Sequence, residues 1–311
     1  MSVLQAADVA PPVTSPADPR VGHLLGRDLA DGAPRPAAVL VGFPSDEGVR
    51  RNGGRPGAAG GPRAIRERLY RLAPDPADDR MTGLVRRTRD LGDVAVSGDL
   101  ERDQDALAEA IAPLVADGVF TIVLGGGHET TFGHFLAYAR GRRPVSILNW
   151  DAHADVRELH DGLAHSGSPF RQALEHPSGA CRRYAVAGLL PWAVAAAHAA
   201  FVCQRGGEVV WRADVTEQRI DALYDDLHAP ALVSFDLDAV DQRDAPGVSA
   251  PAAGGLSADL WLHAAGRAGR CTAVTSADVV ELNPSFDRDG QTARLAALTV
   301  WQLLRGFAQR G

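Results

Sequence analysis

Short apolar runs recur along this chain and alternate with segments whose apolar residues repeat at helical spacing. Residues 120–124, 145–148 and 231–235 are three of these runs, and none contains a charged residue. Strands that are apolar on both faces are typical of parallel sheets covered by helices on both sides. With no linker or internal repeat evident after residue 36, we expect a single α/β domain over residues 37–311, built on a doubly wound, mainly parallel sheet.

Apolar spacing and turn residues also place the individual elements. Strands are expected at residues 37–43, 85–91, 120–124, 145–150, 184–189, 209–211, 231–236 and 273–282. Helices are expected to begin at Gly61, to pass through Leu107 and Val115, and to cover residues 129–140, 168–175, 192–205, 216–227, 257–268 and 292–307. Polar connections are expected at residues 44–57 and 72–83. Residues 1–36, rich in Ala, Pro and Asp, are expected to form a flexible or surface-laid arm.

Composition argues against several classes of protein. The 311 residues carry a formal net charge of −7 and the basic residues are scattered, so we expect no nucleic-acid partner. The chain has neither a run of about 20 apolar residues nor a signal-like start, from which we expect a cytoplasmic protein without membrane contact. Three widely spaced cysteines suggest neither a disulfide framework nor a thiolate metal site.

Acidic and imidazole side chains gather where three of the apolar runs end. They are Asp151, His153 and Asp155 after residues 145–150, Asp236 and Asp238 after residues 231–235, and His128 after residues 120–124 and three glycines. Because alternate side chains of an extended chain point the same way, the aspartates and histidine of each run face one side. The carboxyl ends of neighbouring parallel strands meet at one edge of a sheet, which predicts that these groups lie together.

Four carboxylates and two imidazoles form a set of metal ligands. Oxygen and nitrogen ligands without a thiolate favour manganese over zinc. A lone divalent ion would leave repulsion among four carboxylates, so two ions are the simpler interpretation. Two ions roughly 3.5–4 Å apart can lower the pKa of a water molecule between them and provide a hydroxide nucleophile. The alternative is that Asp151 and Asp236 only cap turns, as aspartates at strand ends commonly do.

The motifs around these residues resemble those of the ureohydrolase superfamily, which includes arginases and agmatinases. The similar segments are residues 126–129 (Gly-Gly-His-Glu), 149–155 (Asn-Trp-Asp-Ala-His-Ala-Asp), 234–238 (Ser-Phe-Asp-Leu-Asp) and 278–284 (Asp-Val-Val-Glu-Leu-Asn-Pro). The resemblance covers residues 37–307. It implies a three-layer α/β/α fold, two Mn(II) ions per subunit with a hydroxide between them that attacks an amidine or guanidine carbon, and a homo-oligomer, either a trimer or a hexamer.

The same resemblance implies roles for single residues. One ion would take His128, Asp151, Asp155 and Asp236, and the other would take Asp151, His153, Asp236 and Asp238. Asp155 would in addition pass a proton to the leaving nitrogen, and Glu281 would pair with the NH groups of the cationic substrate. Without the resemblance, Glu281 would be interpreted as a helix cap.

The residue that follows Asp155 by two positions separates branches of the superfamily. Arginases have an asparagine there that contacts the amino-acid end of the substrate, whereas this chain has Arg157, a planar cation suited to a carboxylate. The sequences at 45–52, 61–66, 166–172 and 245–251 resemble formimidoylglutamase, the branch that hydrolyses N-formimino-L-glutamate to L-glutamate and formamide in histidine degradation. We therefore expect a hydrolase of C–N bonds in linear amidines with a small, acidic substrate. A surface ion pair is the alternative role for Arg157.

Further side chains are candidates for contact with the substrate. Arg51, Asn52 and Ser166 are predicted there, and Arg55 and Arg171 are alternatives to Arg51 for the second carboxylate.

A histidine near residue 167 is a separate candidate. Arginases and agmatinases place a histidine directly before the glycine at this position, whereas this chain has Ser166, as formimidoylglutamases do, and His165 one residue earlier. His165 is a candidate proton shuttle, with an exposed loop histidine as the alternative. The histidines without a partnering pattern, His134 among them, are interpreted as bystanders.

Two other functions stay open on the sequence. One is a ureohydrolase acting on agmatine (an agmatinase) or on an acidic guanidino compound, and Arg157 with residues 46–52 is the feature that separates it from a formimidoylglutamase. The other is a metal-bound family member without catalysis. Such a protein would usually have lost a metal ligand, and here all the ligand positions are intact.

Overall fold

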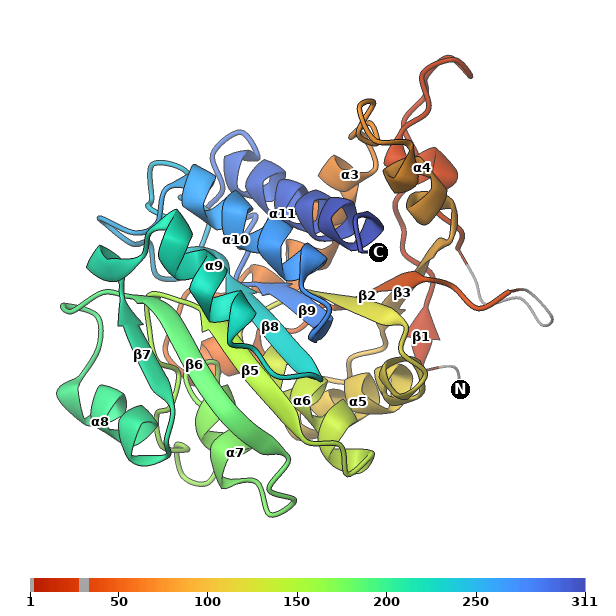
Figure 1. Cartoon of the computed structure of the whole chain (residues 1–311). Helices are drawn as coiled ribbons and strands as arrows, with labels where there is room; N and C mark the ends of the chain where they lie inside the picture. Colours follow the sequence, from red (N-terminus) through yellow and green to blue (C-terminus); the bar gives the residue numbers. More distant parts are fainter. Residues whose placement is uncertain (1–2, 28–33, 311) are drawn as a thin grey trace.

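The described chain is organised around one sheet, with β1 at an edge as its antiparallel strand (Figure 1). The computed structural model describes residues 3–27 and 34–310. The strand order is β1-β3-β2-β4-β9-β8-β5-β6-β7, and the neighbours from β3 to β7 pair in parallel. The strands are β1 Leu4–Gln5, β2 Ala38–Phe43, β3 Thr88–Val94, β4 Phe120–Gly125, β5 Val145–Trp150, β6 Cys181–Leu189, β7 Glu208–Trp211, β8 Ala231–Asp236 and β9 Val274–Val280. The predicted doubly wound, mainly parallel sheet is confirmed.

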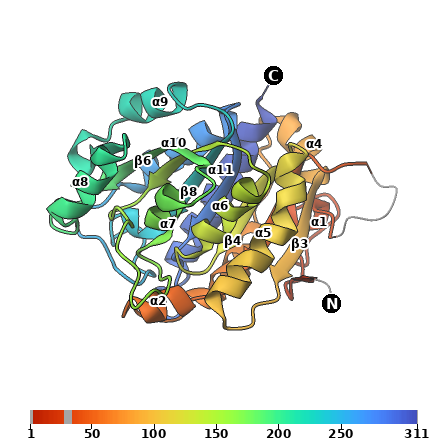
Figure 2. The same cartoon turned by 90° about the horizontal axis from the view of Figure 1, so that it is seen from below.

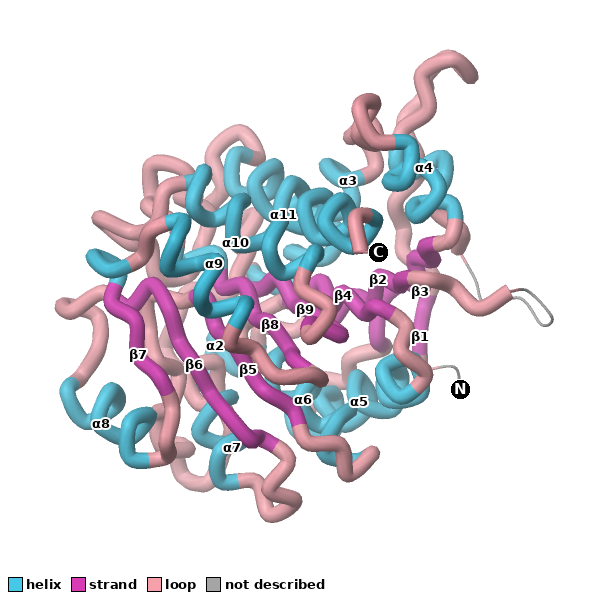
Figure 3. The backbone as a smooth tube through the Cα atoms, viewed as in Figure 1, coloured by secondary structure: helices cyan, strands magenta, loops and turns pink. Residues whose placement is uncertain are grey.

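Helices cover both faces of this sheet, which gives three layers (Figure 3). On one face α3, α9, α10 and α11 pack together, and α5, α6 and α7 cross the other face, which Figure 2 shows from below. The helices are α1 Val21–Leu24, α2 Glu47–Arg51, α3 Gly61–Leu69, α4 Asp79–Arg86, α5 Leu100–Ala116, α6 Thr130–Arg140, α7 Pro169–Glu175, α8 Ala196–Gln204, α9 Glu217–Asp225, α10 Ala258–Arg270 and α11 Gln291–Ala308. No described helix combines the length and the apolar character needed to cross a bilayer.

The central strands are buried on both faces, as their apolar sequences predict. Every residue of β2, β4, β5 and β8 is buried. On one face the ring of Phe235 in β8 meets the ring of Trp261 in α10 edge-on, with 5.2 Å between their centroids. Ser257 caps α10 as predicted, because its side chain accepts from Leu260 N at 3.3 Å. The strand ends that carry the polar residues are thus held by a packed core.

Four neighbouring strands, β4, β9, β8 and β5, bring their carboxyl ends to one edge of the sheet. The parallel register aligns Leu124 with Val279, Asp236 with Val280, and Trp150 with Phe235. Residues that directly follow these strands therefore lie close together, at the edge where ligands gather in open α/β sheets.

Of the two alternatives for the N-terminal arm, residues 3–27 take the surface-laid one. Leu4 and Gln5 pair with β3, Val21 is buried and donates from its backbone to Leu72 O at 2.8 Å, and Gly26 N donates to Thr88 O at 3.1 Å. These bonds tie residues 3–27 to the edge of the domain. The sequence does not reveal them because backbone groups make them, without any apolar periodicity. Residues 28–33 lie outside the described residues, and the boundary near residue 37 stays a prediction.

Two short helices occupy segments that the sequence predicts as connections. Asp78 caps α4, which buries Met81, Leu84 and Val85 on one face. Because α4 extends to Arg86, β3 begins at Thr88 and not at residue 85 as predicted. The other helix, α2, lies within the predicted loop 44–57. Helices this short contain too few turns to show a repeating pattern in the sequence.

Candidate metal centre

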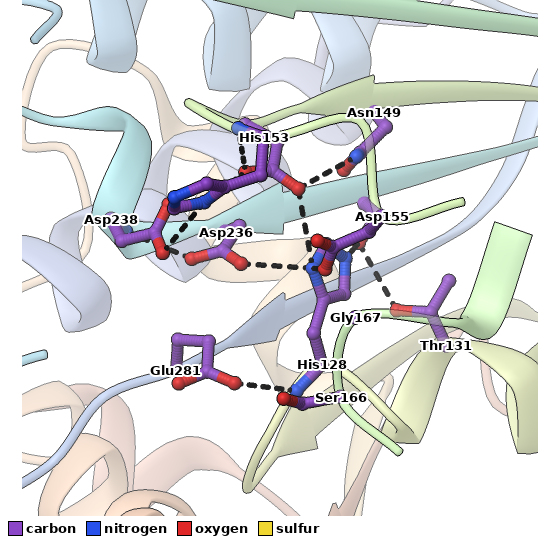
Figure 4. Close-up of polar contacts among 12 residues, drawn as sticks. His128, Thr131, Asn149, His153, Asp155, Ser166, Gly167, Asp236, Asp238 and Glu281 are labelled. Atoms are coloured by element: carbon purple, nitrogen blue, oxygen red, sulfur yellow. Dashed lines mark hydrogen bonds and ion pairs between the residues drawn. The ribbon is translucent and has the colours of Figure 1, made fainter. Parts of the chain in front are cut away.

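Three of the predicted ligands, which follow or end β5 and β8, lie around His128, which follows β4 (Figure 4). Its Nδ1 atom lies 2.8 Å from Asp236 Oδ2, 2.9 Å from Asp155 Oδ2 and 3.4 Å from Asp151 Oδ2. These four residues offer one metal position, with one imidazole nitrogen and three carboxylates around it.

A second group lies next to the first and shares Asp151 with it. His153 Nδ1 is 3.3 Å from Asp151 Oδ1 and 3.2 Å from Asp238 Oδ2. Asp151 therefore presents one oxygen to each group. Asp236 belongs to the first group alone, so a bond from Asp236 to both ions stays a prediction.

The residues of this centre fit divalent metal ions. His128 Nδ1 and Asp238 Oδ1 are buried and make no hydrogen bond of good geometry, although carboxylate oxygens lie 2.8–3.4 Å from His128 Nδ1. Buried polar atoms usually make such a bond, so both atoms fit the role of metal ligands. Carboxylates and imidazoles without sulfur suit hard to borderline ions such as Mn²⁺.

The electrostatics of the centre also favour bound divalent metal ions. Burial, followed by the charges of Asp238 and Asp151, raises the pKa of Asp236 well above its ordinary value. Burial also raises the pKa of Asp238 to about 6, and burial with the charge of Asp236 raises the pKa of Glu281 strongly. A divalent cation would offset this repulsion.

A chain of hydrogen bonds behind the centre orients His128. Its Nε2 atom lies 3.0 Å from Ser234 Oγ, which donates to Asp278 Oδ1 at 2.5 Å, and Asp278 Oδ2 is 2.8 Å from His134 Nδ1. All four residues are buried. Metal-binding imidazoles are commonly held through their second nitrogen, which fixes the nitrogen that faces the metal. The interpretation of His134 as a bystander is therefore wrong, and the packing of α6 on β9 is what reveals its partner.

A polar cavity of about 210 Å³ lies beside the centre. Asp155 and Glu281 line it together with Arg157, Asn52 and Ser166. Asn52 connects Arg157 and Ser166, because its Nδ2 donates to Ser166 Oγ at 3.1 Å and its Oδ1 accepts from Arg157 Nη1 at 3.2 Å. Arg157 is the one arginine among the described residues of the lining.

The other candidate arginines do not line this cavity. Arg51 forms ion pairs with Glu47 at 3.0 Å and Glu101 at 2.7 Å, which neutralise its charge. Arg55 and Arg171 donate to backbone carbonyls, from Nε at 2.9 Å and 3.1 Å respectively. The structure therefore places the predicted substrate contact Arg51 in a structural role, because nearby carboxylates already engage it.

His165 also lies outside the lining. Its Nδ1 accepts from Gly167 N at 3.1 Å, so Nε2 carries the proton and donates to Glu158 O at 2.8 Å. Burial lowers the pKa of His165, which favours this neutral form. With both nitrogens bound to the backbone, His165 shapes the turn before Gly167 and is not placed to shuttle protons.

The two predicted catalytic carboxylates stand on strained backbone. Asp155 has φ 45° and Glu281 has φ 67°, in the left-handed region that side chains larger than glycine's seldom adopt. Glu281 is held there from two directions, since its N donates to Gly126 O and its Oε1 accepts from His128 N, both at 2.8 Å. Strain of this kind is often found at functional sites.

Fold and site together define an α/β protein that carries paired metal positions and a polar cavity at the carboxyl edge of a parallel sheet. The chain belongs to the arginase family, whose model matches residues 36–305. This confirms the resemblance to the ureohydrolase superfamily.

Individual relatives place the chain in the expected branch. It is 39% identical over 304 residues to formimidoylglutamase from Rhodococcus jostii (strain RHA1), covering 91% of this chain and 89% of that protein. It is 36% identical to formimidoylglutamase from Chromobacterium violaceum, with coverage of 87% and 88%. The crystal structure of Trypanosoma cruzi formiminoglutamase with Mn²⁺ has a TM-score of 0.85 at 34% identity, over 94% of this chain and 100% of that chain. The similarity to the formimidoylglutamase branch is thereby confirmed.

Proposed function

We propose that this protein is a formimidoylglutamase, which hydrolyses N-formimino-L-glutamate to L-glutamate and formamide. The observation that carries the proposal is the cavity, where Arg157 shares one lining with Asp155, Glu281 and the metal centre. A cation for the carboxylate end and acidic groups for the amidine end match the two ends of this substrate. The names of the relatives support the same substrate.

We propose two Mn²⁺ ions per subunit as the cofactor. His128, Asp151, Asp155 and Asp236 would hold one ion, and Asp151, His153 and Asp238 would hold the other. Bound there, the ions would lower the pKa of a water molecule and polarise the amidine, so that water attacks at neutral pH. The Trypanosoma cruzi neighbour is by its description a complex with Mn²⁺.

The side chains of the cavity account for binding and proton transfer. Glu281 has one oxygen engaged by His128 N, so its other oxygen is available to accept from the NH groups of a cationic amidine. In the reaction the water oxygen bonds to the formimino carbon, and the bond from that carbon to the glutamate nitrogen breaks. Asp155 takes the proton from the water and delivers it to the leaving nitrogen, as a general base and then a general acid.

Arg157 holds the glutamate end of the substrate. It donates from Nη1 to Asn52 Oδ1, which orients the guanidinium and leaves its other N–H groups for a carboxylate. The hydroxyl of Ser166 and the amide of Asn52 line the same cavity and offer further polar contacts.

An assay of Mn-loaded protein tests this function against the alternatives. N-formimino-L-glutamate, agmatine and arginine are compared side by side, with detection of glutamate, formamide, ammonia and urea. We expect glutamate and formamide from the first substrate alone. Urea from agmatine or arginine would instead indicate another ureohydrolase, and no product from any of them, with both metals bound, would favour a non-catalytic member or a different guanidino acid.

Family membership supports two further proposals, that the protein is a homo-oligomer, either a trimer or a hexamer, and that it works in the cytoplasm. Light scattering tests the first, against a subunit mass of 32.8 kDa. A mass equal to that of one subunit would contradict it.

A further inference from the structure

Glu129, the neighbour of the metal ligand His128, fills a slot between two glycines. Its carboxylate is buried, and Oε1 accepts from Gly48 N at 2.8 Å. A Cβ atom at Gly48 would lie 2.5 Å from Glu129 Cδ, and one at Gly127 would lie 2.1 Å from Glu129 Oε2. The carboxylate thus leaves no room for a side chain at Gly48, and at Gly127 it does so together with Val49 Cγ2, which would lie 2.5 Å from the added Cβ.

By accepting a hydrogen bond from Gly48 N, Glu129 acts as the cap of α2. The backbone N–H groups in the first turn of a helix have no partner within the helix, and Gly48 is in that turn. Asp46 precedes α2 where a capping side chain is expected, but its Oδ2 accepts instead from Gly57 N at 2.5 Å and Ala59 N at 3.3 Å. Glu129, distant in the sequence, supplies the missing acceptor.

The other end of α2 reaches the cavity. Asn52 ends the helix and bonds both to Ser166 and to Arg157. Arg51 adds a bond to Ala164 O at 3.0 Å, on the same loop as Ser166. Because α2 is too short to be stable alone, contacts at its two ends determine where it lies.

We propose that Glu129 is a positioning residue for substrate binding, which fixes the first turn of α2 and thereby sets the position of Asn52 and of Arg157. The inference rests on the proposed function for the identity of the substrate. The contact between Glu129 and α2 is tested separately, by measurements that do not require enzyme activity.

Kinetics of two variants test the effect on the substrate. Glu129→Ala should raise the KM for N-formimino-L-glutamate by about tenfold or more and change kcat by no more than about threefold, with wild-type Mn content. Glu129→Gln should restore the KM, because its amide oxygen can accept from Gly48 N in the same slot. Asp75→Ala is the control, since Asp75 is also buried and accepts from a backbone amide, that of Ala77, but its other partner is Arg305 of α11 rather than a residue of α2. An unchanged KM in Glu129→Ala, or loss of Mn with kcat, would overturn the proposal.

Hydrogen exchange and a double-mutant cycle test the contact itself. Peptides covering residues 47–52 should exchange faster in Glu129→Ala than in the wild type or in Asp75→Ala. Gly48→Ala should lower the unfolding free energy less in Glu129→Ala than in the wild type, because that variant removes the contacts with Cδ and Oε2 at 2.5 and 2.6 Å and leaves only the contact with Cβ at 2.8 Å. Unchanged exchange together with additive effects would overturn the role of Glu129. An inactive wild type would contradict the proposed function, while these two measurements would still decide on Glu129.

Discussion

Among the arginines near the site, Arg157 differs in what its side chain already binds. Arg51 and Arg171 are ion-paired with carboxylates, whereas Arg157 contacts a neutral amide oxygen and lines the cavity. Arg157→Ala should therefore raise the KM by about 10- to 100-fold, as expected for a lost charge-assisted bond worth roughly 1.5–3 kcal/mol. Arg157→Lys should have a KM between those of the wild type and Arg157→Ala, because an ammonium keeps the charge but cannot form the bidentate pair. Arg171→Ala is the matched control, and an equal effect there would refute the assignment.

Single carboxylates of the centre should differ in how many ions they retain. Asp151 faces both metal positions and Asp238 faces one. We expect Asp151→Asn to lose both ions and nearly all activity, and Asp238→Asn to keep about one ion per subunit. Metal analysis of the purified variants measures this directly. Two ions retained in Asp151→Asn would rule out a shared ligand.

At the scale of elements, a buried ion pair joins α3 to β3. Arg66 Nε lies 2.9 Å from Asp90 Oδ2, and both side chains are fully buried. Removing one partner leaves the other charge buried without compensation, so Arg66→Met should lower the unfolding free energy by about 3–5 kcal/mol. Arg63→Met, in the same helix, removes an exposed pair with Glu67 and should cost less than about 1 kcal/mol. Urea unfolding compares the two, and similar losses would contradict this account.

The cap of α4 should make stability depend on pH in acid. The bond from Arg80 lowers the pKa of Asp78 from its ordinary value of 3.8 to about 2. A lowered pKa in the folded state means that the ionised carboxylate stabilises the fold above about pH 4, and that this contribution disappears as the pH falls toward 2. Asp78→Asn keeps a capping side chain and should show a flatter acid profile by circular dichroism. Asp79→Asn, which removes the same charge from the next residue, should follow the wild type.

For the whole molecule, metal binding and folding should be coupled. The ligands follow β4, β5 and β8, so the metal positions exist only when the sheet has formed. Free Mn²⁺ at about 100 times its Kd should add roughly 2.7 kcal/mol of stability and raise Tm by several degrees. Chelation should reverse this increase, and Asp151→Asn should lack it. A Tm independent of Mn²⁺ in the wild type would contradict a native metal site.

Much of the fold and of the centre could be predicted because the signals are local. The apolar runs of β4, β5 and β8 identify buried strands, and Asp151, His153 and Asp155 are found together because they directly follow one of them. The extended alternation predicted for these three residues is wrong, because β5 ends at Trp150 and the chain bends after it. Arg51 and His165 could not be assigned in this way. Their partners, Glu101 for Arg51 and the backbone of the turn for His165, are decided by how loops fold back.

The sequence by itself determined the class of fold and the candidate ligands at the strand ends with the arginine that follows them, because residue type and periodicity express burial and chemistry locally. Tertiary structure alone decided the capping of α2 by Glu129, the link from His134 through Asp278 to His128, and the pairing of β1 with β3. These contacts join segments that are distant in the chain, through hydrogen bonds that any polar side chain or backbone amide could make. Only the packing of the helices and loops on the sheet selects the partners.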